Sequence, residues 1–205
     1  MDIVPLKKSD FAIAVDCLAT AFNQDPLISH GLPDSPEAKQ VALEKMSQGV
    51  LNFAQVFEQT YTTAGGPKGV AVWQPPEESD TSWAQLWSLV GSGMLKTPLF
   101  FRWDRIPDML WLLSTLATLH KKLMPDPHWY LIMLGVAPQY QGQGIGGELI
   151  QPIIEQADRD QVPCYLETTT PAAMRFYERR GFQTIHQDFF AGHSYWAMKR
   201  SPQND

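Results

Sequence analysis

The chain of 205 residues has little cysteine, and its basic residues are outnumbered by acidic ones. The two cysteines, Cys17 and Cys164, form no closely spaced pair, which excludes a disulfide framework and a zinc ribbon and favours a reducing compartment. Lys and Arg total 16 against 22 for Asp and Glu, so the net charge is −6. An acidic chain is poorly suited to neutralising phosphate backbones, and we expect no nucleic-acid partner.

Long hydrophobic runs are also missing. The most apolar stretch, 109–119, is interrupted by Ser114, Thr115 and Thr118 and is far shorter than the ~20 residues that cross a bilayer. The first five residues lack the basic and apolar regions of a signal peptide. These features predict a cytoplasmic protein with no membrane partner.

The chain is rich in material for a core, with 44% hydrophobic and 11% aromatic residues. Together with its length, this predicts one domain over 1–205. The periodicity predicts, in order, a strand at 2–6, a helix that Ser9 caps and that ends at 23–26, a helical region at 36–59, a hairpin of 61–63 with 70–73, helices up to 124, a strand at 129–136, a helix after it, and a last strand at 195–198.

Four of the seven tryptophans fall in the helical stretch: Trp83, Trp87, Trp103 and Trp111. One interpretation is a lid that forms part of an acceptor pocket. The other, which we favour because aromatic stripes are usually core, is a helical layer packed on a sheet.

A glycine-rich loop at 137–147 follows the strand at 129–136 and leads into an amphipathic helix. The start of a helix has unpaired N–H groups and about half a positive charge, and glycines let a phosphate approach them closely. The order of strand, glycine loop and helix therefore predicts a pyrophosphate ligand. Pro152 is expected to bend this helix without ending it.

The same glycines fit a second interpretation. Gly142, Gly144 and Gly147 match the G-x-G-x-x-G fingerprint of dinucleotide-binding proteins, and Glu167 lies 20 residues after Gly147, where such proteins place a ribose-binding acid. The motif begins late in the chain, however, after a hairpin and several helices. The glycines alone do not decide between these ligands.

A second motif makes a family resemblance clear. Gln141-x-x-Gly144-x-Gly146, followed by Ala173-x-x-Phe176-Tyr177-Glu178-x-x-Gly181-Phe182, resembles the GNAT superfamily of acyl-CoA-dependent N-acyltransferases, within it the group that includes puromycin N-acetyltransferase. The resemblance implies a mixed α/β fold with a central, mostly antiparallel sheet, splayed central parallel strands and flanking helices. It places a cofactor-binding core at about 129–183 and leaves about 78–124 as a helical insertion.

The resemblance also implies an acetyl-CoA site between the strand ending at Val136 and the strand ending near Thr168. It assigns cofactor contacts to Leu134, Gly135, Val136, Gln141, Gly142, Gln143, Gly144, Ile145, Gly146, Gly147, Thr168, Thr170, Ala173, Phe176, Tyr177 and Arg179. Thr170 stands where many relatives have Asn. For Arg179 and its basic neighbours Arg175 and Arg180, a solvated helix end is an equally good interpretation.

Tyr177 is implied to be the general acid that protonates the departing thiolate, since a phenol stays protonated at neutral pH. By the same analogy the Val136 N–H would stabilise the oxyanion. Glu167 is the nearest candidate for the general base, although a strand-end residue bonded to backbone and a water relay are alternatives. His120, His128, His186 and His193 have no spacing argument, and we predict no metal.

The resulting prediction is an acetyl-CoA-dependent N-acetyltransferase that acts on the primary amine of a small molecule by direct attack in a ternary complex. A non-catalytic acyl-CoA sensor and a nicotinamide-dependent oxidoreductase remain as alternatives. The resemblance also implies that an edge strand near the C-terminus can pair with a second copy, so a homodimer is among the expected partners.

Overall fold

The computed structural model describes residues 1–76 and 91–203. The first part of the expected helical insertion, including Trp83 and Trp87, lies outside the described residues.

One sheet of seven strands organises the fold, in the order β1-β2-β3-β4-β5-β7-β6. Only β4 and β5 run parallel, and every other neighbouring pair is antiparallel. This confirms the predicted mixed α/β class with a mostly antiparallel sheet. The strands are β1 (Ile3–Pro5), β2 (Thr60–Thr63), β3 (Gly69–Gln74), β4 (Trp129–Val136), β5 (Cys164–Thr168), β6 (Gln183–Phe190) and β7 (His193–Arg200).

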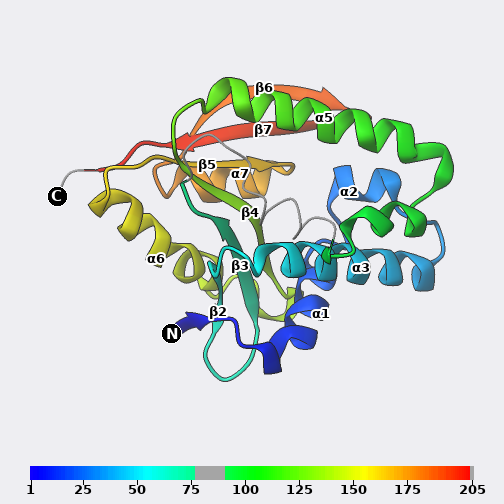
Figure 1. The fold of residues 1–205 in the computed structure, drawn as a ribbon, viewed down its shortest axis with the longest axis horizontal. Helices are drawn as coiled ribbons and strands as arrows, with labels where there is room; N and C mark the ends of the chain where they lie inside the picture. Colours follow the sequence, from blue (N-terminus) through cyan, green and yellow to red (C-terminus); the bar gives the residue numbers. More distant parts are fainter. Residues whose placement is uncertain (77–90, 204–205) are drawn as a thin grey trace.

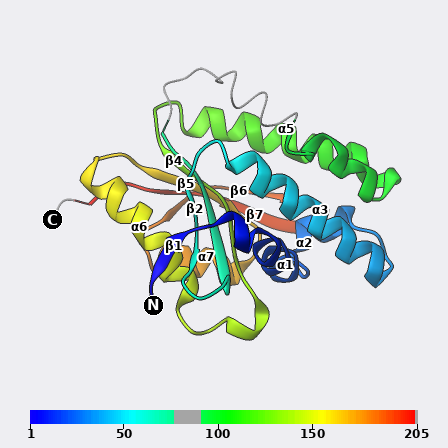
Figure 2. The same cartoon turned by 60° about the horizontal axis from the view of Figure 1, so that its bottom comes forward.

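Helices cover both faces of this sheet. α6 and α7 pack on one face, whereas α1, α3 and α5 pack on the other, where α5 runs along β6 and β7 (Figure 1) and lies beside α3 (Figure 2). The described helices are α1 (Phe11–Ala21), α2 (Pro26–Gly31), α3 (Pro36–Ala54), α5 (Ile106–Leu123), α6 (Ile145–Arg159) and α7 (Pro171–Glu178). Short 3₁₀-helices occupy Lys8–Asp10, Met94–Phe100, Trp103–Arg105 and Pro138–Tyr140.

Three helices begin with the same local device, a capping side chain followed by proline. Asp25 accepts from the amides of residues 27 and 28, Ser35 from residue 38, and Thr170 from residue 173. Proline at the first helical position costs no hydrogen bond there, because that amide has no intrahelical partner. The pattern at 23–26 predicts only the end of the first helix, whereas the structure shows that the same residues also start α2.

The predicted cap of the first helix is wrong. Residues Lys8–Asp10 form a 3₁₀-turn, α1 begins at Phe11, and the Ser9 hydroxyl donates to the Asp10 carboxylate at 3.1 Å rather than to a helix amide. The second helical region also ends earlier than predicted, at Ala54. Residue 58 has φ of 55°, a left-handed conformation that cannot continue a helix.

The largest core cluster lies between α6 and the centre of the sheet. Leu149, Ile150 and Ala157 of α6 are completely buried against Trp73 of β3 and neighbouring residues of β4 and β5. Their spacing is that of one helix face, as the sequence predicted. α6 continues through Pro152 to its end, so the proline does not stop it. This packing fixes the glycine loop before α6 against the end of β4.

No helix within residues 1–76 and 91–203 combines the length and the apolar composition that crossing a membrane requires.

Candidate functional site

The two parallel strands separate where the family resemblance implies a ligand. Residues Trp129–Leu131 of β4 pair with Cys164–Leu166 of β5, and the pairing ends there although both strands continue. The remaining part of β4 keeps its partner β3 on one side only. The predicted splayed parallel strands are therefore present.

A bulge in β4 lies at the point of separation. Leu131 is opposite Trp73 and Met133 is opposite Val72, so Ile132 is an extra residue in the strand. Beyond the bulge Gly135 faces α1, where a Cβ atom would come within 2.9 Å of Leu18. The glycine thus lets α1 pack closely against the strand.

The direction of the β4 amides follows from the pairing with β3. The Ala137 amide donates to the Lys68 carbonyl at 3.0 Å, and opposite residues in an antiparallel ladder alternate between hydrogen-bonded and non-bonded pairs. The pairs Gly69–Val136 and Ala71–Leu134 are consequently of the non-bonded kind. The amides of Leu134 and Val136 therefore point away from β3, toward the side on which β5 has separated.

The carbonyl of Val136 points the same way and accepts a hydrogen bond from the Gln141 side chain at 3.0 Å. Gln141 thus ties the glycine loop to the end of β4. This contact gives the first residue of the glycine motif a role in shaping the loop.

The glycine loop presents a row of backbone amides. The Gly147 amide donates to the Gly144 carbonyl at 2.9 Å, and the Gln141 amide donates to the Pro138 carbonyl at 3.3 Å. In the described part of the chain, the amides of residues 142–146 have no such backbone partner. The amides available to an anion are therefore five, at Gly142, Gln143, Gly144, Ile145 and Gly146, fewer than the predicted range of 141–147.

Arg180 is the basic side chain that faces this loop. Its guanidinium lies 3.7 Å from the centre of the Phe176 ring, donates to the Phe176 carbonyl at 2.9 Å, and leaves no space for a side chain at Gly147. Burial, with the charge of Arg179 nearby, lowers the pKa of Arg180. Arg179, which the resemblance placed at the cofactor, is exposed at the end of α7.

The start of α7 brings further predicted cofactor residues to the same place. The ring of Phe176 lies 3.3 Å from the position of a Cβ atom at Gly146, and Ala173 packs against the main core. Thr168 is buried at the end of β5. The Thr170 hydroxyl caps α7 by accepting from the Ala173 amide at 3.2 Å, so Thr170 has a structural task besides any contact with a ligand.

Tyr177 lies on the buried face of α7, between the rings of Phe176 and Phe182. Burial raises its pKa well above the ordinary value of a phenol, and the nearby Arg180 offsets this only in part. In the part of the chain that the structure describes, no group hydrogen-bonds its hydroxyl. Tyr177 is thus protonated at neutral pH and has its proton available to donate.

Glu167 lies on the opposite face of the sheet. Residues 165 and 167 of β5 share this face, and the side chains of Tyr130 and Tyr165 interact with the Glu167 carboxyl group. Burial raises the pKa of Glu167 to about 7, although both tyrosines favour its charged form. At neutral pH the Glu167 carboxyl group is therefore partly protonated and partly ionised.

Some contacts near this point had no sequence signal. The hydroxyl of Thr169, just after β5, hydrogen-bonds the carboxylate of Asp25, 144 residues away, and so fixes the start of α2 beside the end of β5. His120 and His128 contact each other, whereas His186 is half-buried on β6 and His193 is exposed at the start of β7. The described residues contain no group of three or more side chains suited to hold a metal.

Comparison with known proteins identifies relatives along most of the chain. An uncharacterized N-acetyltransferase from Schizosaccharomyces pombe is 25% identical over 183 residues, which cover 86% of this chain and 72% of that protein. An acetyltransferase from Corynebacterium glutamicum, described with histone acetyltransferase HPA2, has a similar structure, with a TM-score of 0.64, 20% identity and coverage of 99% and 97% of the two chains.

A third relative is the polyamine N-acetyltransferase of Drosophila melanogaster, described as catalysing the formation of N-acetylagmatine. Its structure gives a TM-score of 0.60 at 17% identity and covers 98% of this chain and 100% of that one. The model of the acetyltransferase (GNAT) family matches residues 73–182, more than half of the sequence. With the splayed strands and the glycine loop in the same region, the chain belongs to the acetyltransferase (GNAT) family.

Proposed function

We propose that this chain transfers an acetyl group from acetyl-CoA to the primary amine of a small molecule, by direct attack in a ternary complex. The observation that carries the proposal is the row of backbone amides at 142–146, which lies at the start of α6 beside the separated end of β4. Such amides match the oxygens of a diphosphate, which acetyl-CoA contains.

The neighbouring groups fit the rest of that molecule. Arg180 adds a positive charge next to the loop. The amides of Leu134 and Val136 point to the side of β4 that β5 has left, where a pantetheine arm would accept their hydrogen bonds as a neighbouring strand does. When bound, acetyl-CoA supplies the activated acetyl group. The Val136 amide is then the donor placed to stabilise negative charge on the acetyl oxygen.

Tyr177 is the proposed general acid. Its pKa is raised by burial, so the hydroxyl is protonated at neutral pH and can donate its proton to the thiolate sulfur as the carbon–sulfur bond breaks. The side chain belongs to α7, which also provides Phe176 and Arg180 at the glycine loop. One short helix would therefore position both a phosphate contact and the acid.

Glu167 is the proposed general base, which takes the proton that the attacking amine must lose. A carboxyl group with a pKa of about 7 is suited to this task, because the best general base has a pKa near the working pH. Tyr177 and Glu167 lie on opposite faces of the sheet, on either side of the separated strands. The amine would then approach from the face of α5, away from Tyr177.

The small size of the acceptor is the most specific part of the proposal. It is supported by the resemblance to the puromycin N-acetyltransferase group and by the likeness to an enzyme that forms N-acetylagmatine. The segments that border the proposed amine side are α2 and α5, which lie outside the two motifs at 141–146 and 173–182. They are the elements expected to select the acceptor.

The testing experiment is a thiol-release assay with acetyl-CoA and a panel of amines that includes agmatine, other polyamines, puromycin and a peptide N-terminus. We expect release with a small amine, and a loss of kcat of about 10²-fold or more in both Tyr177→Phe and Glu167→Gln. Unchanged kcat in Tyr177→Phe would remove the acid role.

A binding measurement separates the remaining alternatives. Acetyl-CoA at 100 times its dissociation constant is expected to stabilise the chain by ~2.7 kcal/mol, whereas NAD and NADP are expected to leave its melting temperature unchanged. Binding of acetyl-CoA without turnover of any amine would favour a sensor. Stabilisation by NAD or NADP alone would contradict the proposal.

A further inference from the structure

Two histidines and two tyrosines form one cluster on the face of the sheet where Glu167 lies. The ring of His120, on α5, is 4.4 Å from that of Tyr130 on β4 and 4.5 Å from that of Tyr165 on β5, with which it stacks at 20°. His128 precedes β4, and its ring centre is 4.9 Å from that of His120. We call His120, His128, Tyr130 and Tyr165 the four-ring cluster.

The hydrogen bonds of the cluster determine where its protons are. The Asp126 carbonyl can only accept, so His128 donates to it from Nδ1, at 2.7 Å. In a neutral His128 the Nε2 atom is then an acceptor, and His120 must donate to it from its own Nε2, at 2.6 Å. The bond is lost if both rings carry two protons, because two N–H groups would then face each other.

The surroundings keep this pair uncharged. Burial, with repulsion between the two rings, lowers the pKa of His120 to about 4. Burial also lowers the pKa of His128, and Lys199 on β7 acts in the same direction. The other side chains that pack here from α5 and the loop after it are the apolar Leu119, Leu123 and Met124.

The tyrosines connect this pair to Glu167. Tyr130 and Tyr165 are direct neighbours in the parallel register of β4 and β5, and both side chains interact with the Glu167 carboxyl group. Tyr195 on β7 is the other titratable group that acts on Tyr165. In the described residues, the buried Tyr165 hydroxyl has no partner with ordinary hydrogen-bond geometry. The Glu167 carboxyl group, two residues along β5 on the same face, is an acceptor that already acts on the pKa of Tyr165.

We propose that Tyr130 and Tyr165 are positioning residues for Glu167, and that the neutral His120–His128 pair holds their rings in the orientation this requires. The proposal rests on the function of Glu167 as the base. The tyrosine hydroxyls stabilise the ionised carboxylate, which is the form that accepts the proton of the amine. The stacked imidazole of His120 stops both phenol rings from turning away.

The first test removes each hydroxyl. Tyr130→Phe and Tyr165→Phe are expected to move the acidic limb of the pH profile of kcat upward by about one pH unit each, the size that loss of one hydrogen bond to a charged group predicts. Tyr61→Phe is the matched control. Tyr61 lies on β2, away from Glu167, and its hydroxyl donates to the Gln59 side chain at 2.7 Å, so the acidic limb should not move.

A second readout does not depend on turnover. In chain labelled with carboxyl-¹³C glutamate, the resonance that disappears in Glu167→Gln is assigned to Glu167, and its titration is followed in the free protein. The midpoint should rise in both tyrosine variants. If acetylation proceeds but this midpoint and the limb stay where they are, the positioning role is wrong while the proposed function stands. If no amine is acetylated, the function fails independently of the midpoint.

The histidine is tested by a pair of variants. His120→Ala removes the stacked ring, and we expect it to raise the Glu167 midpoint as Tyr165→Phe does. His120→Phe keeps a ring of similar shape and should restore most of the parent value. Adding His120→Ala to a chain that already carries Tyr130→Phe and Tyr165→Phe should shift the midpoint little further, because the imidazole acts through those two hydroxyls. An unshifted midpoint in His120→Ala, or full additivity, would overturn the role of the pair.

Discussion

At the scale of single residues, the proposed phosphate site depends on backbone conformations that suit glycine. Gly142 and Gly144 have φ of 75° and 82°, and Gly144 caps α6 in the left-handed region. A residue with a Cβ atom pays roughly 1–2 kcal/mol to adopt this conformation. These two glycines turn the chain so that successive amides of the loop face one side.

Gly144→Ala is therefore expected to weaken acetyl-CoA binding by roughly 5- to 30-fold, because the strain is relieved by turning the amides away. The matched control is Gly65→Ala in the turn between β2 and β3. Gly65 has φ of 79°, and at both glycines a Cβ atom would meet nothing within 4 Å. The control should lose similar stability and keep its affinity. Calorimetric titration of both variants makes the comparison, and equal affinity in the two would contradict the role of the loop.

The residues carrying a motif were the ones that the sequence could place. Gly144 and Tyr177 were found because the family motif fixes their positions, and they lie at the loop and on α7 as expected. Arg179 and Arg180 are adjacent at a helix end, where pattern alone does not say which side chain turns inward. His120 and His128 meet only because α5 packs across β4 and β5, a tertiary contact without a sequence signal.

At the scale of elements, the ends of α6 and β7 are held together by an ion pair in which Arg200 is buried and Asp158 is half-buried. Arg200 donates to both oxygens of Asp158 at 2.6 and 2.7 Å and, through Nε, to the Arg180 carbonyl at 3.1 Å. The Gln203 amide also donates to Asp158, at 2.7 Å. Figure 1 shows β7 reaching the end of α6 as the chain leaves the sheet. This pair therefore closes the layer of α6 against the sheet.

Arg200→Met should lower the free energy of unfolding by about 3 kcal/mol, since it leaves a carboxylate without its partner next to the core. For a chain of this size the melting temperature should fall by roughly 6 to 12 °C. Arg159→Met is the control, because Arg159 is exposed on α6 and, among the described residues, its side chain bonds that of Gln156. Thermal unfolding followed by circular dichroism checks both variants. A fall of the melting temperature by the same amount in the control would show that the Asp158–Arg200 pair does not account for the loss of stability.

Element boundaries were predicted well where periodicity and punctuation agreed. The strand at 129–136 matches β4, because an apolar run covered on both faces has few alternatives. α2 was not predicted because Asp25 and Pro26 both follow the end of one helix and start the next, and the sequence pattern indicates only the first of these. The bulge at Ile132 had no signal either, since it depends on the pairing with β3.

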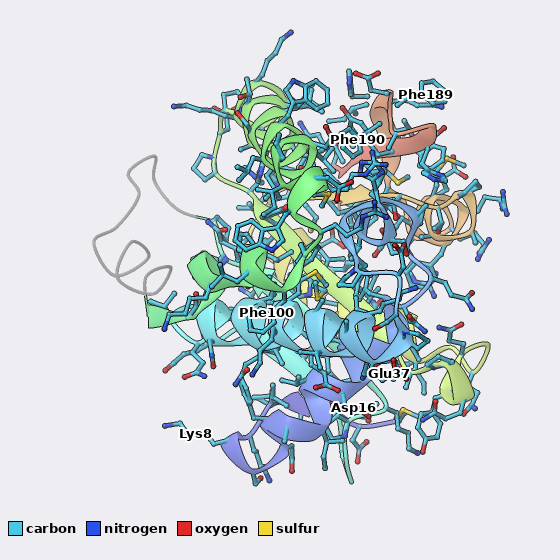
Figure 3. All side chains as sticks on the ribbon, turned by 90° about the vertical axis from the view of Figure 1, so that its right-hand side faces the viewer. Lys8, Asp16, Glu37, Phe100, Phe189 and Phe190 are labelled. Carbon is cyan, nitrogen blue, oxygen red and sulfur yellow. The ribbon has the colours of Figure 1, made fainter. Side chains whose placement is uncertain are left out.

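At the scale of the whole molecule, the sheet separates two chemical environments. One face, under α6 and α7, holds the glycine loop and Tyr177, and the other, under α1, α3 and α5, holds Glu167 and the four-ring cluster. The far end of the second face is closed by an aromatic contact. Phe190 is buried and stacks against Trp111 of α5, with 5.8 Å between the ring centres, whereas Phe189 points into solvent (Figure 3).

This division places two titratable groups with opposite shifts in one layer. His120 takes up a proton when the chain unfolds between about pH 4 and its ordinary pKa of 6.5, so its contribution makes the fold less stable as the pH falls. Glu167 releases a proton on unfolding between its ordinary pKa of 4.5 and about 7, so its contribution makes the fold more stable as the pH falls. From pH 4.5 to 6.5 the two contributions oppose each other.

Single substitutions should reveal how each group makes the free energy of unfolding depend on pH. Relative to the parent, Glu167→Gln should lose stability on acidification from pH 6.5 to 4.5, and His120→Phe should gain it, each by up to about 1.4 kcal/mol per pH unit. Urea unfolding at intervals across this range measures both, and subtracting the parent curve removes the contributions of all other groups. Curves parallel to the parent would mean that both groups titrate as they do in the unfolded chain, and would contradict the raised pKa of Glu167 and the lowered pKa of His120.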